Sequence, residues 1–311
     1  MLHNGSVRRV LLSTVALISV LPACNLPAPP TENVPRNDSP ALLMDAGHFR
    51  RAEAILVPLA EANPDDPNTA WLLSRAKAAL GDLDTSLKLA EKAVAADDTN
   101  ADYHVQLAAT CGRIAEKANL LKQLTLAKRA KKELDTALAL DPQNLDALYG
   151  LMLYYYAAPS MIGGDKKKAQ QMADAMTTVD AGRGYLAQAR LAHEMKDPVK
   201  EEEFYKKSIE ANPQFYEPKA ALAGFYLNLP KPDQASAENY ACDALAADPG
   251  RADAWKSLAE IRVASQCWTE LDNLLALAEQ FDPDDLAPYY SAATAMLRIS
   301  SSGIAGRRKR T

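Results

Sequence analysis

The sequence has few residues of the kinds that build sheets, disulfide scaffolds or nucleic-acid surfaces. Aromatic residues make up 6% of the 311 residues, and there are 13 Gly. No run alternates polar residues with β-branched apolar ones, so we expect no sheet. The four Cys are scattered, without the spacing of a disulfide framework or of a metal-ligand set. The formal charge of −5 argues against nucleic acid as a partner.

Plentiful Ala and Leu instead predict helices. Apolar residues recur at helical spacing over 255–261, pause at Ser265-Gln266, and recur again over 271–278. The pair Asp282-Pro283 then ends the pattern, because Pro cannot continue a helix. Residues 254–283 therefore predict two amphipathic helices joined by a tight turn. Neither helix can bury its apolar stripe alone, so such a unit needs neighbours of its own kind.

Helix-ending pairs of this type recur along the chain, at Asn63-Pro64, Asp97-Asp98, Asp141-Pro142, Asn212-Pro213, Asp248-Pro249 and Asp282-Pro283. The interval is 34 residues from Pro64 to Asp98 (98 − 64) and again from Pro249 to Pro283 (283 − 249). Five positions before the second member of five pairs lies a small residue: Ala93, Ala137, Ser208, Ala244 and Ala278. Seven positions further back lie Ser86, Ala130, Glu201, Ala237 and Leu271.

This spacing resembles the tetratricopeptide repeat (TPR) family, over about residues 35–287. The resemblance implies an all-α fold, a right-handed solenoid of about seven helix-turn-helix repeats with a C-terminal capping helix. Departures are the missing Pro at Asp98 and Asp180 and the bulky Glu201 and Leu271 at small-residue positions. We expect repeats at 35–68, 69–102, 103–146, 147–183, 184–217, 218–253 and 254–287, a cap at 288–300, and a basic disordered tail at 301–311.

Two repeats depart from the common length. The third has ten extra residues, which predicts that both of its helices are lengthened by more than a turn. Leu120, Leu121 and Leu124 would lie on this projection; we expect them to pack on the next repeat, and an exposed partner surface is the alternative. In the fourth repeat, residues 160–164 predict an enlarged turn and Asp165 the N-cap of the second helix.

The N-terminus indicates an export signal over residues 1–23, with Arg8-Arg9 before an apolar run too short to span a bilayer comfortably. Leu21-Pro22-Ala23-Cys24 resembles the lipobox of bacterial lipoproteins, which implies acyl chains, palmitate among them, on Cys24. Pro22 is unusual there, and a secreted protein or a retained anchor are the alternatives. Residues 24–38 predict a disordered tether. We expect a protein anchored in the cell envelope, preferably in the outer membrane facing the periplasm, because Asn25 is not the Asp that favours inner-membrane retention.

No arrangement of residues predicts catalysis, a metal site or a cofactor. His193-Glu194 followed by Asp197 nearly spells a zinc-protease helix, but the second His is missing. The run Gly163-Gly164-Asp165-Lys166-Lys167 lacks the spacing and the preceding strand of a phosphate loop. A turn with solvated Lys residues is the expected interpretation, and contact with an anion is the alternative. The sequence therefore predicts that the protein is not an enzyme.

A TPR solenoid offers a concave wall made by the first helix of each repeat. Carried over position by position, the family's ligand-facing pattern gives these candidate binding residues: Trp71, Arg75, Arg113, Tyr149, Tyr156, Arg190 and His193. Packing between helices is the alternative for Trp71 and for some of the tyrosines. We expect a scaffold that binds a protein or peptide in its groove. The alternative is a transporter-associated lipoprotein that helps deliver a small ligand from a periplasmic solute-binding protein, with residues 154–156 lining an apolar channel.

Overall fold

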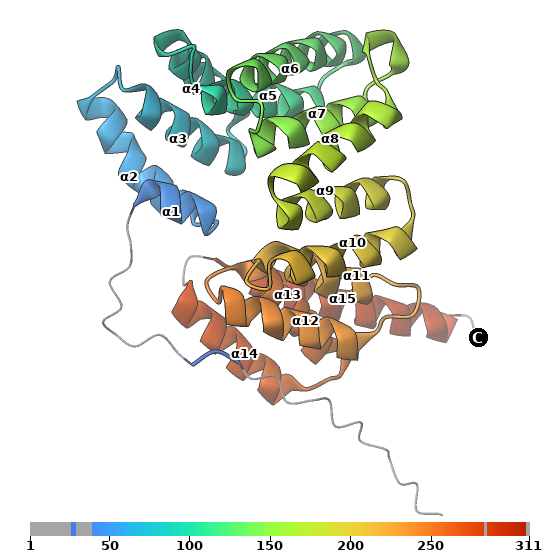
Figure 1. The fold of residues 1–311 in the computed structure, drawn as a ribbon. Helices are drawn as coiled ribbons and strands as arrows, with labels where there is room; N and C mark the ends of the chain where they lie inside the picture. Colours follow the sequence, from blue (N-terminus) through green and yellow to red (C-terminus); the bar gives the residue numbers. More distant parts are fainter. Residues whose placement is uncertain (1–25, 29–38, 283–284, 309–311) are drawn as a thin grey trace, which may run out of the picture.

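The computed structural model describes residues 26–28, 39–282 and 285–308, and these contain fifteen α-helices and no strand (Figure 1). The helices are α1 (Pro40–Asp45), α2 (Phe49–Ala62), α3 (Pro67–Ala79), α4 (Leu83–Ala96), α5 (Ala101–Ala115), α6 (Leu120–Leu140), α7 (Leu145–Ala157), α8 (Lys166–Val179), α9 (Ala181–Glu194), α10 (Pro198–Ala211), α11 (Tyr216–Leu227), α12 (Gln234–Ala247), α13 (Ala252–Ala264), α14 (Trp268–Phe281) and α15 (Ala287–Arg308). The first fourteen form seven consecutive hairpins. The predicted all-α solenoid with a terminal helix is confirmed.

Many of the helices begin where a short polar side chain satisfies backbone N–H groups that have no partner inside the helix. Asp66 accepts a hydrogen bond from the backbone N–H of Thr69, and Asn144 does the same for Ala147. Pro67 and Pro198 occupy the first helical position, where a missing N–H costs nothing. These local signals set the length of each hairpin, and so the repeat period.

The small residues of the repeat pattern lie where the hairpins pack closest. Ala93, Ala137, Ser208 and Ala244 are all fully buried. The backbones of α8 and α9 approach even more closely at Gly184, because a Cβ built on this residue would lie 2.3 Å from the Cα of Thr177 on α8. The core is accordingly a series of local clusters that join neighbouring hairpins, as expected of a solenoid.

The third hairpin differs from its prediction in two respects. Only its second helix is much longer than the others, since α6 has 21 residues and α5 has 15. The expectation that both helices lengthen is wrong, because Asn119 caps α6 early by accepting a hydrogen bond from the N–H of Lys122. Leu120 and Leu121 at the start of α6 are 69% and 78% exposed. Their predicted packing on the next repeat is therefore also wrong, because they lie in the first turn, beyond the adjoining hairpin.

The fourth hairpin has the enlarged turn that its sequence predicts. After α7, Ser160–Ile162 forms one turn of 3-10 helix, and Gly163 follows with φ 102°, a conformation that favours glycine. Asp165 then caps α8 through the backbone N–H groups of Lys167 and Lys168. The hydroxyl of Tyr154 donates to the carbonyl of Ile162 and holds the turn against α7.

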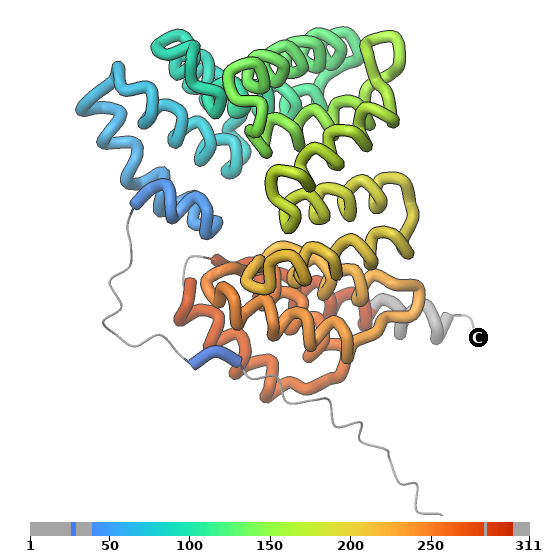
Figure 2. Tube along the Cα trace, in the orientation of Figure 1, coloured from blue at the N-terminus to red at the C-terminus, as the bar shows by residue number. Residues whose placement is uncertain are grey.

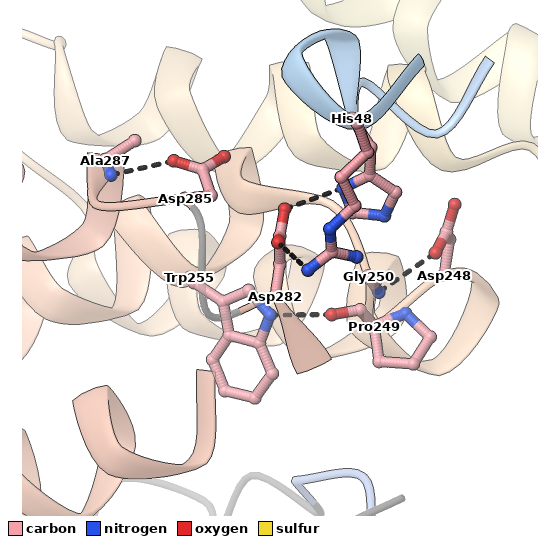
Figure 3. A network of polar contacts seen from close by, with 9 residues as sticks. His48, Asp248, Pro249, Gly250, Trp255, Asp282, Asp285 and Ala287 are labelled. Atoms are coloured by element: carbon pink, nitrogen blue, oxygen red, sulfur yellow. Dashed lines mark hydrogen bonds and ion pairs between the residues drawn. The ribbon is translucent and has the colours of Figure 1, made fainter. Parts of the chain in front are cut away.

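The seven hairpins follow a curved path that brings the last one back to the first (Figures 1 and 2). His48 at the start of α2 lies 2.6 Å from Asp282 at the end of α14, and Arg51 donates to the same carboxylate over 2.9 Å (Figure 3). Next to this contact, the indole N–H of Trp255 donates to the carbonyl of Pro249. The open groove expected from the sequence is thus closed at one edge by a contact between the two ends of the solenoid.

The terminal segments are only partly described. The signal segment 1–23, Cys24 and most of the tether lie outside the described residues, as do 309–311 of the tail. Leu26, inside the expected tether, packs on the C-terminal core cluster, so this residue does more than act as a spacer. The terminal helix α15 packs mainly on α13 and buries Ala292 there. No helix in the described part of the chain has the length and apolar content needed to cross a membrane.

Candidate binding site

A cavity of about 380 Å³ lies where the ends of the solenoid approach each other. Its walls come from three parts of the chain: the first hairpin, the first helices α3 and α5, and the loop before α13. Each of the last three elements contributes one guanidinium group, from Arg75, Arg113 and Arg251. Asp45 is the one carboxylate among the residues that line the cavity. The charged residues that line the cavity are therefore mainly basic.

Arg75 is held in place from two sides. Its guanidinium lies over the ring of Trp71, 5.1 Å from the centroid, and its Nη2 is 3.4 Å from Asp45 Oδ1. Trp71 in turn packs on Tyr103, with ring centroids 5.9 Å apart. Trp71 thus has the packing role that the sequence left open, and it supports the arginine one helical turn further on.

Arg251 is also fixed, by residues of the preceding hairpin. Its guanidinium lies 4.3 Å from the centroid of the Tyr216 ring, and its Nη1 is 2.5 Å from Glu217 Oε1. The hydroxyl of Tyr216 accepts a hydrogen bond from the N–H of Ala254, which anchors the ring to the first turn of α13. Arg113 differs from both, because it is exposed and has no hydrogen bond or ion pair among the described residues.

A buried polar network forms one wall of the cavity. Gln106 donates from its side-chain amide to the hydroxyls of Ser74 (3.0 Å) and Thr110 (3.2 Å). Ser86 lies 3.1 Å from Ser74 and 3.0 Å from Thr110, so α3, α4 and α5 are joined through four side chains. Such a network, which joins three helices, makes this wall rigid.

The other predicted residues gather at a second place, on α7 and α9. Tyr149 is half-buried, and burial raises the pKa of its hydroxyl while Arg190 nearby acts in the opposite direction. The hydroxyl of Tyr156 donates to the carbonyl of Glu194 over 2.5 Å. His193 is exposed, with its Nδ1 3.0 Å from Glu201 Oε1. The structure therefore places Arg75 and Arg113 in the cavity and Tyr149, Tyr156, Arg190 and His193 away from it.

Comparison with solved structures agrees with this arrangement of hairpins. The structure of a thermophilic TPR protein from Thermus thermophilus matches with a TM-score of 0.54 and 18% sequence identity, over 60% of this chain and 95% of that one. The chain has the TPR fold. A tetratricopeptide repeat protein from Parabacteroides merdae matches with a TM-score of 0.48 and 17% identity, over 83% of this chain and 96% of that one. PilF of Pseudomonas aeruginosa matches with a TM-score of 0.42 and 16% identity, over 73% and 97% respectively.

Comparison with protein families by sequence matches only part of the chain. The family described as regulator of microtubule dynamics protein 1-3 matches residues 42–196, from α1 to the end of the first helix of the fifth hairpin. No curated protein matches this chain. At 18% identity, the Thermus thermophilus structure shows the fold of this chain alone.

No three His, Cys, Asp or Glu residues come together as a metal site within the described ranges. Burial raises the pKa of the Cys111 thiol to about 11, which keeps it protonated and unreactive. Cys267 is a free thiol.

Sequence reasoning missed Arg251, Asp45 and Gln106. Gln106 lies two helical turns before Arg113 on the wall-forming helix α5, so a pattern extended two turns toward the N-terminus of α5 could have included it. Arg251 precedes α13, outside the first-helix positions that the family pattern selects. It reaches the cavity because the solenoid curves back on itself, and no local spacing encodes that.

Proposed function

We propose that this chain is a non-enzymatic scaffold that binds an acidic segment of a protein partner along its first-helix wall. The observation that carries the proposal is the state of Arg113 on α5 and Arg190 on α9. Both are exposed, and neither has a hydrogen bond or an ion pair in the described part of the chain. Arginines that are free on a wall with half-buried tyrosines are suited to bidentate pairing with carboxylates.

The tyrosines beside Arg190 support the same proposal. Tyr149 and Tyr156 are half-buried, and Tyr156 is fixed by its bond to the carbonyl of Glu194. Rigid aromatic side chains next to arginine supply contact area at low entropic cost, as in the residues that dominate many protein interfaces. His193 extends the same surface by one turn of α9.

The test is capture of the partner by a charge-reversed variant. Arg113→Glu together with Arg190→Glu is expected to abolish capture from cell envelopes while the helical circular dichroism stays unchanged. Lys128→Glu with Lys132→Glu is the matched control, because these lysines are exposed on α6 and the charge change is the same. Undiminished capture by the arginine variant would refute the assignment of this wall.

The proposal includes export and a lipid anchor on Cys24, in the outer membrane facing the periplasm. It is supported by the lipobox-like residues 21–24, by the apolar run before them, and by the solenoid body that follows. Mass spectrometry of the N-terminal peptide of the mature protein tests it. A diacylated thioether on Cys24 is expected, and a Cys24 that is free or disulfide-bonded would contradict the anchor.

Delivery of a small ligand is the second candidate, favoured by the cavity of about 380 Å³. The apolar channel expected at residues 154–156 does not support it, because Tyr154 is buried and bonded to the carbonyl of Ile162. The ring of Tyr155 lies within 5.7 Å of Lys131 and 5.5 Å of Lys168. Native mass spectrometry of the protein from its own host separates the two candidates, since a co-purifying small molecule would favour delivery.

A further inference from the structure

We propose that the cavity bounded by Arg75, Arg113 and Arg251 is a binding site for a small anion that carries two or more carboxylate or phosphate groups. The site goes beyond the scaffold function, because it requires no protein partner. Its occupancy also ties the first hairpins of the solenoid to the last.

The charged groups that line the cavity favour an anion as its ligand. Three guanidinium groups from α3, α5 and the loop before α13 line one cavity with a single carboxylate, Asp45. Asp45 contacts Arg75 at 3.4 Å but its side chain is 66% exposed, so it neutralises little of the charge of Arg75. Glu217, which does not line the cavity, pairs with Arg251, so Arg113 is the guanidinium that no carboxylate balances among the described residues. Like charges gathered in a cleft repel one another, and a multivalent anion between them removes that repulsion.

Two of the arginines are already held in place for an anion. Arg75 is held by Trp71, and Arg251 is held by Tyr216 and Glu217. Two of the three guanidinium groups are therefore already oriented, which reduces the entropic cost of forming bidentate bonds to an oxyanion. Arg113 is unpaired among the described residues and can close over the ligand from the third side.

The size and the other walls define the class of ligand. A volume of about 380 Å³ is within the range of pockets for small molecules and is too small for a folded segment of protein. Met44, Phe49 and Ala78 provide apolar surface for a short carbon skeleton. Gln106 uses its amide nitrogen on Ser74 and Thr110, so its carbonyl oxygen is left to accept a hydrogen bond from a ligand hydroxyl.

The position of the cavity couples binding to the closure of the solenoid. Asp45 and Phe49 belong to the first hairpin, whereas Arg251 belongs to the last. A ligand that contacts both ends binds the closed form better than an open one. By mass action it therefore stabilises the contact between His48 and Asp282.

Calorimetric titration and thermal unfolding of the mature chain test the site, with citrate and pyrophosphate as probes and acetate as the monovalent comparison, all at constant ionic strength. Binding and an increase in melting temperature are expected with at least one of the two multivalent anions, and neither is expected with acetate. Arg251→Met and Arg113→Met are each expected to weaken binding by roughly tenfold or more, because each removes charged hydrogen bonds. Arg183→Met, which removes an exposed arginine from α9, is the control and is expected to bind as the parent does.

Three outcomes would overturn the site: no binding of either multivalent anion, equal binding of acetate, or unchanged binding in Arg113→Met. The last variant removes an exposed side chain, so a folding defect cannot account for its result. Partner capture is scored separately with Arg190→Glu, which lies outside the cavity. If Arg190→Glu loses partner capture and the parent protein binds no anion, the proposed scaffold function is supported and the anion site is rejected.

Discussion

The Nδ1 of His48 lies 2.6 Å from Oδ2 of Asp282, although 234 positions separate the two residues in sequence. Arg51 bonds to the other oxygen of the same carboxylate at 2.9 Å. The side chain of Asp282 is 11% exposed, so the carboxylate accepts these bonds in a mostly dry environment. It is the residue on which the contact between the first and last hairpins depends.

Asp282→Ala is therefore expected to lower the free energy of unfolding by roughly 1–3 kcal/mol, because it leaves two part-buried donors without their acceptor. Urea unfolding followed by circular dichroism measures the change. Asp272→Ala, on the exposed face of α14, is the control, with an expected change within about 0.5 kcal/mol. Equal stability of the two variants would show that the contact contributes nothing.

The buried ion pair between α12 and α13 gives a second prediction. Arg262 Nη2 is 2.5 Å from Oε1 of Glu238, which is 1% exposed, and its Nε is 3.0 Å from Glu270 Oε2. The second oxygen of Glu238 has no partner among the described residues, so its charge is balanced by Arg262 alone. Arg262→Ala is expected to destabilise the protein by about 3–5 kcal/mol, and Arg262→Met with Glu238→Leu by much less.

Chemical denaturation of these variants checks both expectations. Lys207→Ala is the comparison, because it removes the exposed pair with Glu203, for which a much smaller loss of stability is expected. A double variant that is as unstable as Arg262→Ala would show that the loss of stability does not come from leaving the Glu238 carboxylate buried and unpaired.

Two glycines inside helices, one in close contact with a neighbouring helix and one not, test how closely the hairpins pack. A Cβ on Gly184 would lie 2.3 Å from backbone atoms of Thr177, whereas a Cβ on Gly112 would meet nothing within 4 Å. Gly184→Ala is expected to destabilise by about 1–3 kcal/mol, because α8 and α9 must separate. Gly112→Ala is expected to stabilise by about 0.5–1 kcal/mol, from helix propensity alone. Melting temperatures that move in the same direction would contradict the close approach of these helices.

The repeat pattern was predictable because local spacing encodes it. The small residues Ala93 and Ala244 are buried between helices as their spacing requires. Leu271, a bulky residue at a small-residue position, is buried as well, since the neighbouring surface accommodates it. The length of α5 was misjudged because residues 116–119, between α5 and α6, contain no Gly or Pro to mark the turn.

The cavity was only half predictable. Arg75 and Arg113 follow from the first-helix register, and the structure brings both to one cavity. Arg251 enters through the curvature of the whole solenoid, which is the sum of small rotations at every hairpin. The rotation cannot be predicted from the residues of one repeat, so the three-dimensional structure is needed to show that the two ends meet.

The buried thiol of Cys111 predicts a dependence on pH. Its pKa of about 11 is raised by burial above the ordinary value of 9.0, so the folded state retains the proton better than the unfolded state. The resulting stability is present below about pH 9 and is lost as the pH rises toward 11. At pH 8, iodoacetamide is expected to modify Cys267 and to leave Cys111 unmodified until the protein unfolds, as measured by peptide mass spectrometry. Equal labelling of both residues in the native protein would contradict this burial.

The distance between the two ends of the solenoid distinguishes a closed arrangement of the hairpins from an open one. Spin labels on Arg50→Cys at the start of α2 and Glu279→Cys near the end of α14, in a Cys267→Ser background, would be measured by double electron–electron resonance. The contact between His48 and Asp282 predicts one narrow population at short distance, which broadens and lengthens when Asp282→Ala is added. A long or broad distribution in the parent protein would show that the hairpins form an open solenoid, and would remove both the contact and the three-arginine cavity.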